Sequence, residues 1–262
     1  MAISFNGSTH LRSGASTPTT TPATICGWAR PISGDYAYLA SIGSADGSAI
    51  LGLVFHGGLG AIVASSLANG SWSSSIGQPW LLNQWQHCAA VFKADGTWLL
   101  YQDGLLTGTK TTVNQPSGLD QLVVGARPPG ILPMLGDLAE VAVWSTELDD
   151  ADVAVLAKGV TPIALAHRRR SLAAYHPLVA GATGGIPSLG DPVTTTGTPG
   201  FAEHPPVIRS IGIPHATPAI VPPAPVFPRL AAAACLPTGA ANGGVFAPGA
   251  AAGVVLPGVK AA

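Results

Sequence analysis

Charge is scarce in this sequence. Asp, Glu, Lys and Arg together make up 10% of its 262 residues, against about 25% in an average soluble chain. The 12 basic and 13 acidic residues leave a net charge of −1, so the composition predicts neither a nucleic-acid nor a membrane partner. A weakly charged exterior is expected where neighbouring subunits cover it. An alanine-rich composition explains it equally well, and both interpretations stay open.

Other common features are missing. Cys26, Cys88 and Cys235 are odd in number and widely spaced, which argues against a disulfide framework and a zinc site. The opening MAISFNGSTHLRSG lacks the basic and apolar regions of a secretion signal, so no signal peptide is expected. No apolar run reaches the ~18–20 residues that span a bilayer. No G-x-S-x-G elbow occurs, which leaves His56 as a turn residue and His87 as a packed histidine.

Strand patterns fill residues 1 to about 145. The clearest stretch is Trp85 to Gly108, where Asp95-Gly96 and Asp103-Gly104 separate apolar runs. Such dipeptides between alternating residues are strong hairpin signals. Turns at this frequency predict an all-β sandwich or barrel.

One helix is expected at about residues 147–158. Thr146 is its predicted N-cap, with Asp149 in the capping-box position three residues later. Gly159 is suited to the C-cap, and Pro162 prevents continuation. The pattern indicates a short helix that lies on a β core.

The C-terminal part changes character. Residues 171–203 return to strand-like patterns, whereas residues 204–262 hold 11 of the 24 prolines and no acidic residue. This composition favours an extended Pro/Ala/Gly-rich arm that cannot fold alone, so the predicted division is a domain at 1–203 and an assembly arm at 204–262. The apolar anchors available to the arm are Ile211, Ile213, Ile220, Val221, Val226, Phe227, Leu230 and Phe246.

Several segments together resemble the laminin-G-like, concanavalin A-like jelly-roll domains, in a phage virion-associated form. They are Ile3–Gly7, Ile25–Arg30, Trp85–Phe92 with Leu100–Gly104, Val124–Arg127 and Gly136–Trp144. The resemblance covers about residues 1–203. It implies two antiparallel sheets with a curved, often ligand-binding face, and therefore an all-β, two-sheet antiparallel jelly-roll sandwich with one short helix.

Some relatives of this fold are glycoside hydrolases, which need two carboxylates on one face of a strand. Asp137 and Glu140 form the candidate pair. A separation of three sends them to opposite faces of a regular strand, so no catalytic residue is predicted and the protein is not expected to be an enzyme. Asp137 is expected to end a turn, and Glu140 to accept hydrogen bonds at a sandwich edge.

The resemblance also implies calcium, which relatives bind through loop carboxylates and backbone carbonyls. The acids in probable loops show no ligand spacing, and most of them precede a glycine in a turn. They are Asp35, Asp46, Asp95, Asp103 and Asp120. No metal ligand and no cofactor are therefore predicted, with calcium kept as the alternative.

A carbohydrate site needs an exposed aromatic side chain. Trp72 and Trp80, in the stretch SWSSSIGQPW, are the candidates, and the alternative is that they pack at the sandwich rim. The basic run His167–Arg170 is either a solvated loop or a contact for an acidic partner.

Two functions follow from the resemblance and the composition. The first is a virion structural protein, a capsid decoration or accessory protein of a tailed bacteriophage, located in the virion. Its arm would bind other virion proteins or copies of the same chain. The alternative is a lectin-like carbohydrate-binding module of a phage tail or cell-surface protein, with surface glycans as partners.

Overall fold

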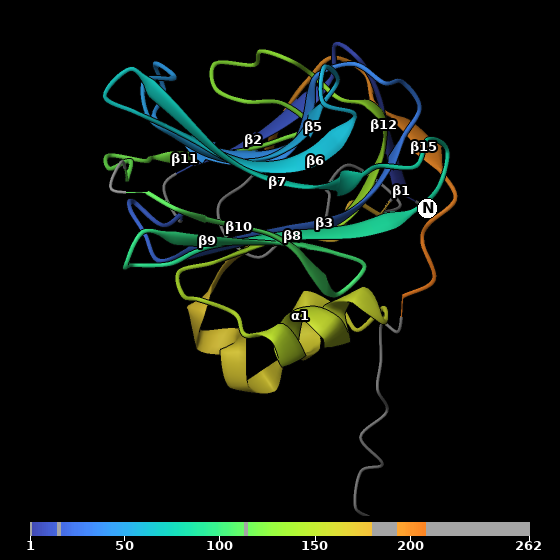
Figure 1. Cartoon of the computed structure of the whole chain (residues 1–262). Helices are drawn as coiled ribbons and strands as arrows, with labels where there is room; N and C mark the ends of the chain where they lie inside the picture. The colour runs from blue at the N-terminus through green and yellow to red at the C-terminus, as the bar shows by residue number, and fades with distance from the viewer. Residues whose placement is uncertain (1, 15–16, 113–114, 180–192, 208–262) are drawn as a thin grey trace, which may run out of the picture. The chain divides into compact units, whose positions relative to one another are not determined.

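The computed structural model describes residues 2–14, 17–112, 115–179 and 193–207. Within them the chain forms two antiparallel sheets that pack face to face, which confirms the predicted sandwich (Figure 1). The sheet that carries the helix, here called the helix-side sheet, has the strand order β10-β9-β8-β3-β12-β1-β15, with β13 paired to β12. Its strands are β1 (Ala2–Asn6), β3 (Ala23–Pro31), β8 (Gln86–Phe92), β9 (Thr97–Gln102), β10 (Leu105–Thr111), β12 (Leu135–Trp144), β13 (Leu172–His176) and β15 (Gly200–Ala202).

The second sheet, here called the strap-side sheet, has the strand order β14-β2-β11-β4-β5-β6-β7. Its strands are β2 (His10–Ser13), β4 (Ala37–Gly43), β5 (Ile50–His56), β6 (Ala61–Ala68), β7 (Ser71–Pro79), β11 (Gln121–Val124) and β14 (Val193–Thr196). In Figure 1 it lies above the helix-side sheet, and helix α1 (Asp150–Ala157) lies below both.

Alternating strand residues build the core between the sheets. Along β5, Leu51, Leu53 and Phe55 point inward and are almost completely buried. From the other sheet, Phe92 and Trp98 meet them as an edge-to-face pair with ring centroids 5.7 Å apart. Each such side chain stabilises the fold by roughly 1.5–3 kcal/mol through burial. The two predicted hairpin turns are confirmed, because they join β8 to β9 and β9 to β10.

The helix forms close to its predicted place, but the predicted N-cap is wrong. Asp149 caps α1: its carboxylate accepts a hydrogen bond from the Asp152 backbone N–H at 2.9 Å, and the Asp152 carboxylate accepts one from the Asp149 N–H. Arg168 donates to both carboxylates, at 2.9 and 2.6 Å. Thr146 lies before this cap. Arg168, which is distant in the sequence, stabilises the capping box that starts at Asp149 because it donates hydrogen bonds to both of its carboxylates.

Replacing Asp149 with Ala is expected to lower the free energy of unfolding by about 1–2 kcal/mol, because the first turn of α1 loses its capping acceptor. Thr146→Ala is the matched control and should change stability by less than about 0.5 kcal/mol. Urea unfolding of both variants gives the comparison. Equal destabilisation by the two substitutions would contradict this description of the helix start.

A segment between β11 and β12, residues 125–134, lies on the outer face of the strap-side sheet (Figure 1). It is called the strap. The Ser41 hydroxyl donates to the Ala126 carbonyl at 3.0 Å, and the Tyr38 backbone N–H donates to the Leu132 carbonyl at 3.2 Å. Leu132 also packs on a small apolar cluster outside the main core. The strap therefore covers part of the outer face of the strap-side sheet.

The last described segment is held against the sandwich. β14 and β15 extend an edge of the strap-side and helix-side sheets respectively. Beyond them, the His204 Nε2 lies 3.1 Å from the buried Glu140 carboxylate, and Pro206 packs closely against Gly159 at the end of α1. The predicted boundary at Glu203 stays a prediction. All eight predicted arm anchors, from Ile211 to Phe246, lie outside the described residues.

In the part of the chain that the structure describes, no helix is long and apolar enough to cross a membrane.

Candidate functional site

Trp72 lies on the outer face of the strap-side sheet. It is on the edge strand β7, where it pairs across the ladder with Leu67, and Leu67 packs on the apolar cluster outside the core. Cross-strand partners share a face, so Trp72 points outward, and 47% of its surface is exposed. Ser74 and Ile76 follow at the alternate positions of β7 and are exposed as well. An apolar platform with a neighbouring hydroxyl results.

Arg127 extends from the strap to Trp72. Its guanidinium carbon lies 5.5 Å from the centre of the Trp72 ring, within cation–π distance. The strap holds the Arg127 backbone in place, because its N–H donates to the Ile131 carbonyl at 3.0 Å and its own carbonyl accepts from the Gly130 N–H at 2.6 Å. The Nε atom is buried and has no hydrogen-bond partner among the described residues.

Two tyrosines lie near this cation. Burial raises the pKa of both Tyr36 and Tyr38, and the positive charge of Arg127 acts in the opposite direction on each. The Tyr36 ring packs against the His56 imidazole with centroids 4.5 Å apart. Both phenols therefore stay neutral near pH 7. The surface made by Trp72, Ser74, Ile76, Arg127, Tyr36 and His56 is called the Trp72 face below.

Of the two tryptophans proposed as sugar platforms, the structure exposes one. Trp80 is only 9% exposed and packs edge-on against Phe55 with ring centroids 5.0 Å apart. The exposure expected for Trp80 is therefore wrong, because the chain turns inward after β7 and places this ring in the core. The alternative, that this side chain packs against the sandwich, applies to Trp80, which belongs to the main core cluster.

A polar hollow of about 260 Å³ adjoins the turn that precedes β7. Asn69 and Gly70 of that turn contribute to its wall, together with Ser48, Gln115 and Ser117. Hydroxyl and amide groups of this kind bind sugar hydroxyls by hydrogen bonds. The hollow and Trp72 adjoin the same turn, because Trp72 follows Gly70 by only two residues.

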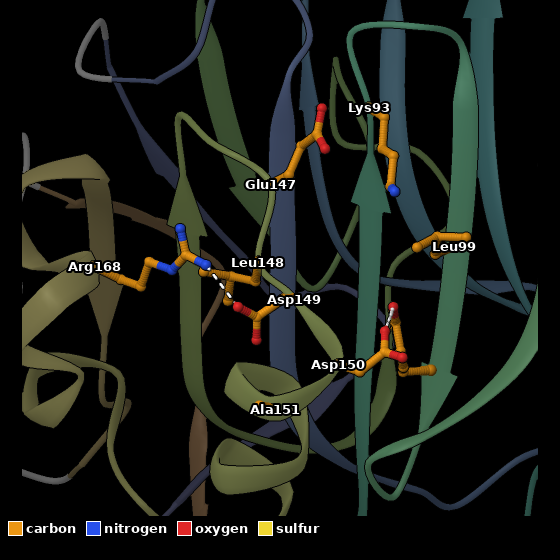
Figure 2. Close-up of a pocket in the computed structure, with 9 residues that line it drawn as sticks. Lys93, Leu99, Glu147, Leu148, Asp149, Asp150, Ala151 and Arg168 are labelled. Atoms are coloured by element: carbon orange, nitrogen blue, oxygen red, sulfur yellow. Dashed lines mark hydrogen bonds and ion pairs between the residues drawn. The ribbon is translucent and has the colours of Figure 1, made fainter. Parts of the chain in front are cut away.

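A larger hollow of about 600 Å³ lies where the start of α1 meets β9 (Figure 2). Its polar groups already have partners within the protein. Arg168 and Asp149 form an ion pair at 2.9 Å, the Tyr101 hydroxyl donates to Asp150 at 2.6 Å, and Glu147 accepts from the Ala94 N–H. These contacts seat α1 on the sheet. The basic run predicted at His167–Arg170 lies in a short 3-10 helix beside it.

The two carboxylates considered for hydrolysis are both buried and both occupied. Asp137 is in β12 rather than at a turn, and Arg30 donates to it at 2.7 Å. A bulge between Ala139 and Ala142 inserts an extra residue, so Glu140 lies beside Tyr175, whose hydroxyl donates to it. The opposite-face prediction assumed a regular strand and is wrong for this reason. Neither side chain is more than 3% exposed.

Three of the five loop aspartates accept hydrogen bonds at or beside their turns. Asp46 accepts hydrogen bonds from Ser44 and Ser48, Asp95 from the Thr97 N–H, and Asp103 from the His87 N–H. Among the described residues, no three His, Cys, Asp or Glu side chains are grouped so that they could hold a metal ion.

Comparison with known proteins now identifies the family. A laminin-G-type model of the concanavalin A-like lectin/glucanases superfamily matches residues 5–154, more than half of the chain. The chain belongs to the concanavalin A-like lectin/glucanase superfamily. No curated protein sequence matches it.

Solved structures of similar fold agree with membership of this superfamily. A heptameric pentraxin from Limulus polyphemus matches with a TM-score of 0.50 and 21% identity, over 74% of this chain and 93% of its own. Domain 4 of an extracellular arabinanase from Geobacillus stearothermophilus, solved with arabinotriose, matches with a TM-score of 0.52 and 19% identity, over 60% and 76%.

A putative carbohydrate-binding protein from Bacteroides ovatus matches with a TM-score of 0.50 and 19% identity, over 76% of this chain and 60% of its own. At these identities the likeness establishes the fold alone.

Sequence reasoning found Trp72 but missed its neighbours. Arg127 was noticed only as part of a family-like segment, and His56 only as a turn residue. One signal was available: Arg127 is the single charged residue between Asp120 and Asp137. A lone cation in an apolar loop has no charged partner nearby in the sequence. Such a residue is expected to contact a distant segment of the chain or a ligand.

Proposed function

We propose that this chain is a non-catalytic carbohydrate-binding module and that its site is the Trp72 face. The observation that carries the proposal is the exposure of Trp72, 47%, on a rigid strand beside hydrogen-bonding groups. An aromatic ring held on a strand offers apolar area at little entropic cost. The C–H face of a sugar ring can stack on it while hydroxyls and amides nearby bind the sugar hydroxyls.

The fold comparisons support this class of function over the alternative. One structure of similar fold contains arabinotriose, and a second carries the description of a putative carbohydrate-binding protein. None of the three structures described above is a virion protein. The assembly role predicted for residues 204–262 rests on composition, with its anchors outside the described residues, so the virion hypothesis stays a prediction from the sequence.

The absence of catalysis is part of the proposal. Asp137 and Glu140 have protein partners and almost no exposure, so neither is placed to reach a glycosidic bond. An assay of the full chain on polysaccharides should give no released reducing sugar.

Trp72→Ala is expected to weaken binding of the glycan ligand by about 30-fold. Truncating a Trp at the centre of a binding surface commonly costs about 2 kcal/mol or more. A glycan array first identifies the ligand, and isothermal titration then compares wild type with the variant. Because Trp72 is half exposed, thermal unfolding of the variant should stay within a few degrees of wild type.

Phe201→Ala is the matched control. Phe201 is 61% exposed but lies on β15 in the other sheet, so its loss should leave glycan affinity unchanged. A glycan that binds Trp72→Ala as tightly as wild type would move the site away from the Trp72 face. No glycan bound by the wild-type chain would refute the module itself.

A further inference from the structure

Two arginines of the described structure, Arg30 and Arg168, form ion pairs with acids, and Arg127 does not. Arg30 is 2.7 Å from Asp137, and Arg168 is 2.6 Å from Asp152. No carboxylate in the described part of the chain forms an ion pair with Arg127. Its positive charge is therefore presented on the outer face of the strap-side sheet without neutralisation by a described acid.

The contact that Arg127 does make leaves its donors unused. A cation–π contact with Trp72 draws on the ring electrons and consumes none of the five guanidinium N–H groups. The Nε donor is buried with no acceptor, a condition that is unfavourable unless a partner arrives. The remaining side chains of the Trp72 face, Tyr36, His56, Ser74 and Ile76, include no acid.

We propose that the ligand of the Trp72 face is a saccharide that carries a carboxylate, with its ring against Trp72 and its carboxylate against the Arg127 guanidinium. This inference rests on the proposed carbohydrate-binding function. A guanidinium binds a carboxylate through two parallel N–H···O bonds, which fixes direction as well as charge. The guanidinium carbon lies 5.5 Å from the ring centre, so one monosaccharide unit can contact both groups.

The strap makes this arrangement rigid. Three backbone hydrogen bonds at Arg127 and the contacts of Ala126 and Leu132 with the sheet fix the backbone that carries the guanidinium, which lies beside Trp72 without any ligand. A preformed cation loses little entropy on binding. A neutral sugar could accept hydrogen bonds from this guanidinium but would lack the ion pair that a carboxylate adds.

The test uses the full chain and a matched pair of ligands. Oligogalacturonate carries one carboxylate per sugar, and its methyl ester has the same rings without the charge. These two are titrated beside an array of neutral, carboxylated and sulfated glycans. A carboxylated glycan should bind at least tenfold more tightly than its ester or neutral counterpart at low salt, and added NaCl should reduce the difference.

Three variants separate the roles of charge and stacking. Arg127→Gln should abolish the preference for the acid over the ester, because loss of the positive charge weakens binding of the acid far more than binding of the ester. Arg127→Lys should keep part of the preference, because the charge remains without the paired donors. Arg169→Gln, a change at an exposed arginine on the 3-10 helix away from this face, should leave both affinities unchanged. Thermal unfolding confirms that each variant is folded.

The outcomes distinguish this inference from the proposed function. Equal binding of acid and ester, a preference for sulfated over carboxylated glycans, or an acid preference that survives Arg127→Gln would overturn the carboxylate assignment. Each of these leaves the module intact if Trp72→Ala still removes binding. No glycan bound at all overturns both proposals together.

Discussion

The protein is expected to lose folding stability steeply as the pH falls below 6.5. His87 and His176 are each 1% exposed. Burial lowers the pKa of His87 to about 3 and that of His176 to about 4. The Nδ1 of His87 and both ring nitrogens of His176 lack hydrogen-bond partners in the described structure, so nothing there stabilises a proton.

The direction follows from proton binding. In the unfolded chain each imidazole takes up a proton near pH 6.5, whereas in the folded chain it does so only near pH 3 or 4. Between these values the unfolded state binds more protons, and acid therefore favours unfolding. Each histidine therefore lowers the free energy of unfolding by about 1.4 kcal/mol for every pH unit by which the pH falls in this range. Between pH 6.5 and 4.5 the two histidines together should lower the free energy of unfolding by roughly 5 kcal/mol, which is comparable with the whole stability of many domains.

Urea unfolding at pH 7, 6 and 5 measures this slope. His87→Phe and His176→Leu should each flatten it by about half, because a side chain that cannot titrate replaces one that does. Thr146→Ala, which removes no titratable group, is the control and should leave the slope unchanged. A free energy of unfolding that does not change between pH 7 and 5 would contradict the burial of these two imidazoles.

Gly125→Ala is expected to destabilise the protein by about 2–5 kcal/mol. Gly125 begins the strap with a φ of +78°, and a Cβ there would lie 2.5 Å from the buried Phe5 ring. The left-handed backbone costs a non-glycine residue about 1–2 kcal/mol, and overpacking a core ring costs about 1–3 more. The midpoint of thermal unfolding should fall by roughly 10 °C.

Gly118→Ala separates the two causes. Gly118 has nearly the same backbone, with a φ of +71°, but no atom lies within 4 Å of the position of an added Cβ. It should cost only the backbone part, about 1–2 kcal/mol. If both substitutions have the same effect, Phe5 does not confine the start of the strap as the structure describes.

The sequence was sufficient for the sandwich because its signals are local. Asp95-Gly96 and Asp103-Gly104 mark two hairpins by themselves, and alternation along Thr97–Gln102 marks the strand between them. The helix was found for the same reason. The first residue of the helix could not be identified in the same way, because Thr146 and Asp149 are both suited to start a capping box. Arg168, far along the chain, contacts both acids of the box that forms.

The candidate site was harder to predict because it depends on contacts between distant segments. Trp72 and Trp80 are eight residues apart and look alike in sequence, yet one is exposed and the other packs on Phe55. Arg127 reaches Trp72 across 55 positions. The bulge at Glu140 has no sequence mark, and it changes which face that carboxylate occupies.

The strand order has a consequence for biosynthesis. Among the described strands, β1 pairs with β12 and β15, and β2 pairs with β11 and β14. At the usual elongation rate of about 5–20 residues per second, β15 leaves the ribosome roughly 10–40 s after β1. Until β12 emerges, roughly 7–27 s after β1, the apolar residues Ile3 and Phe5 have no strand to pair with. β1 is thus among the last strands whose pairing is completed, and both sheets stay open at these edges until β14 and β15 arrive.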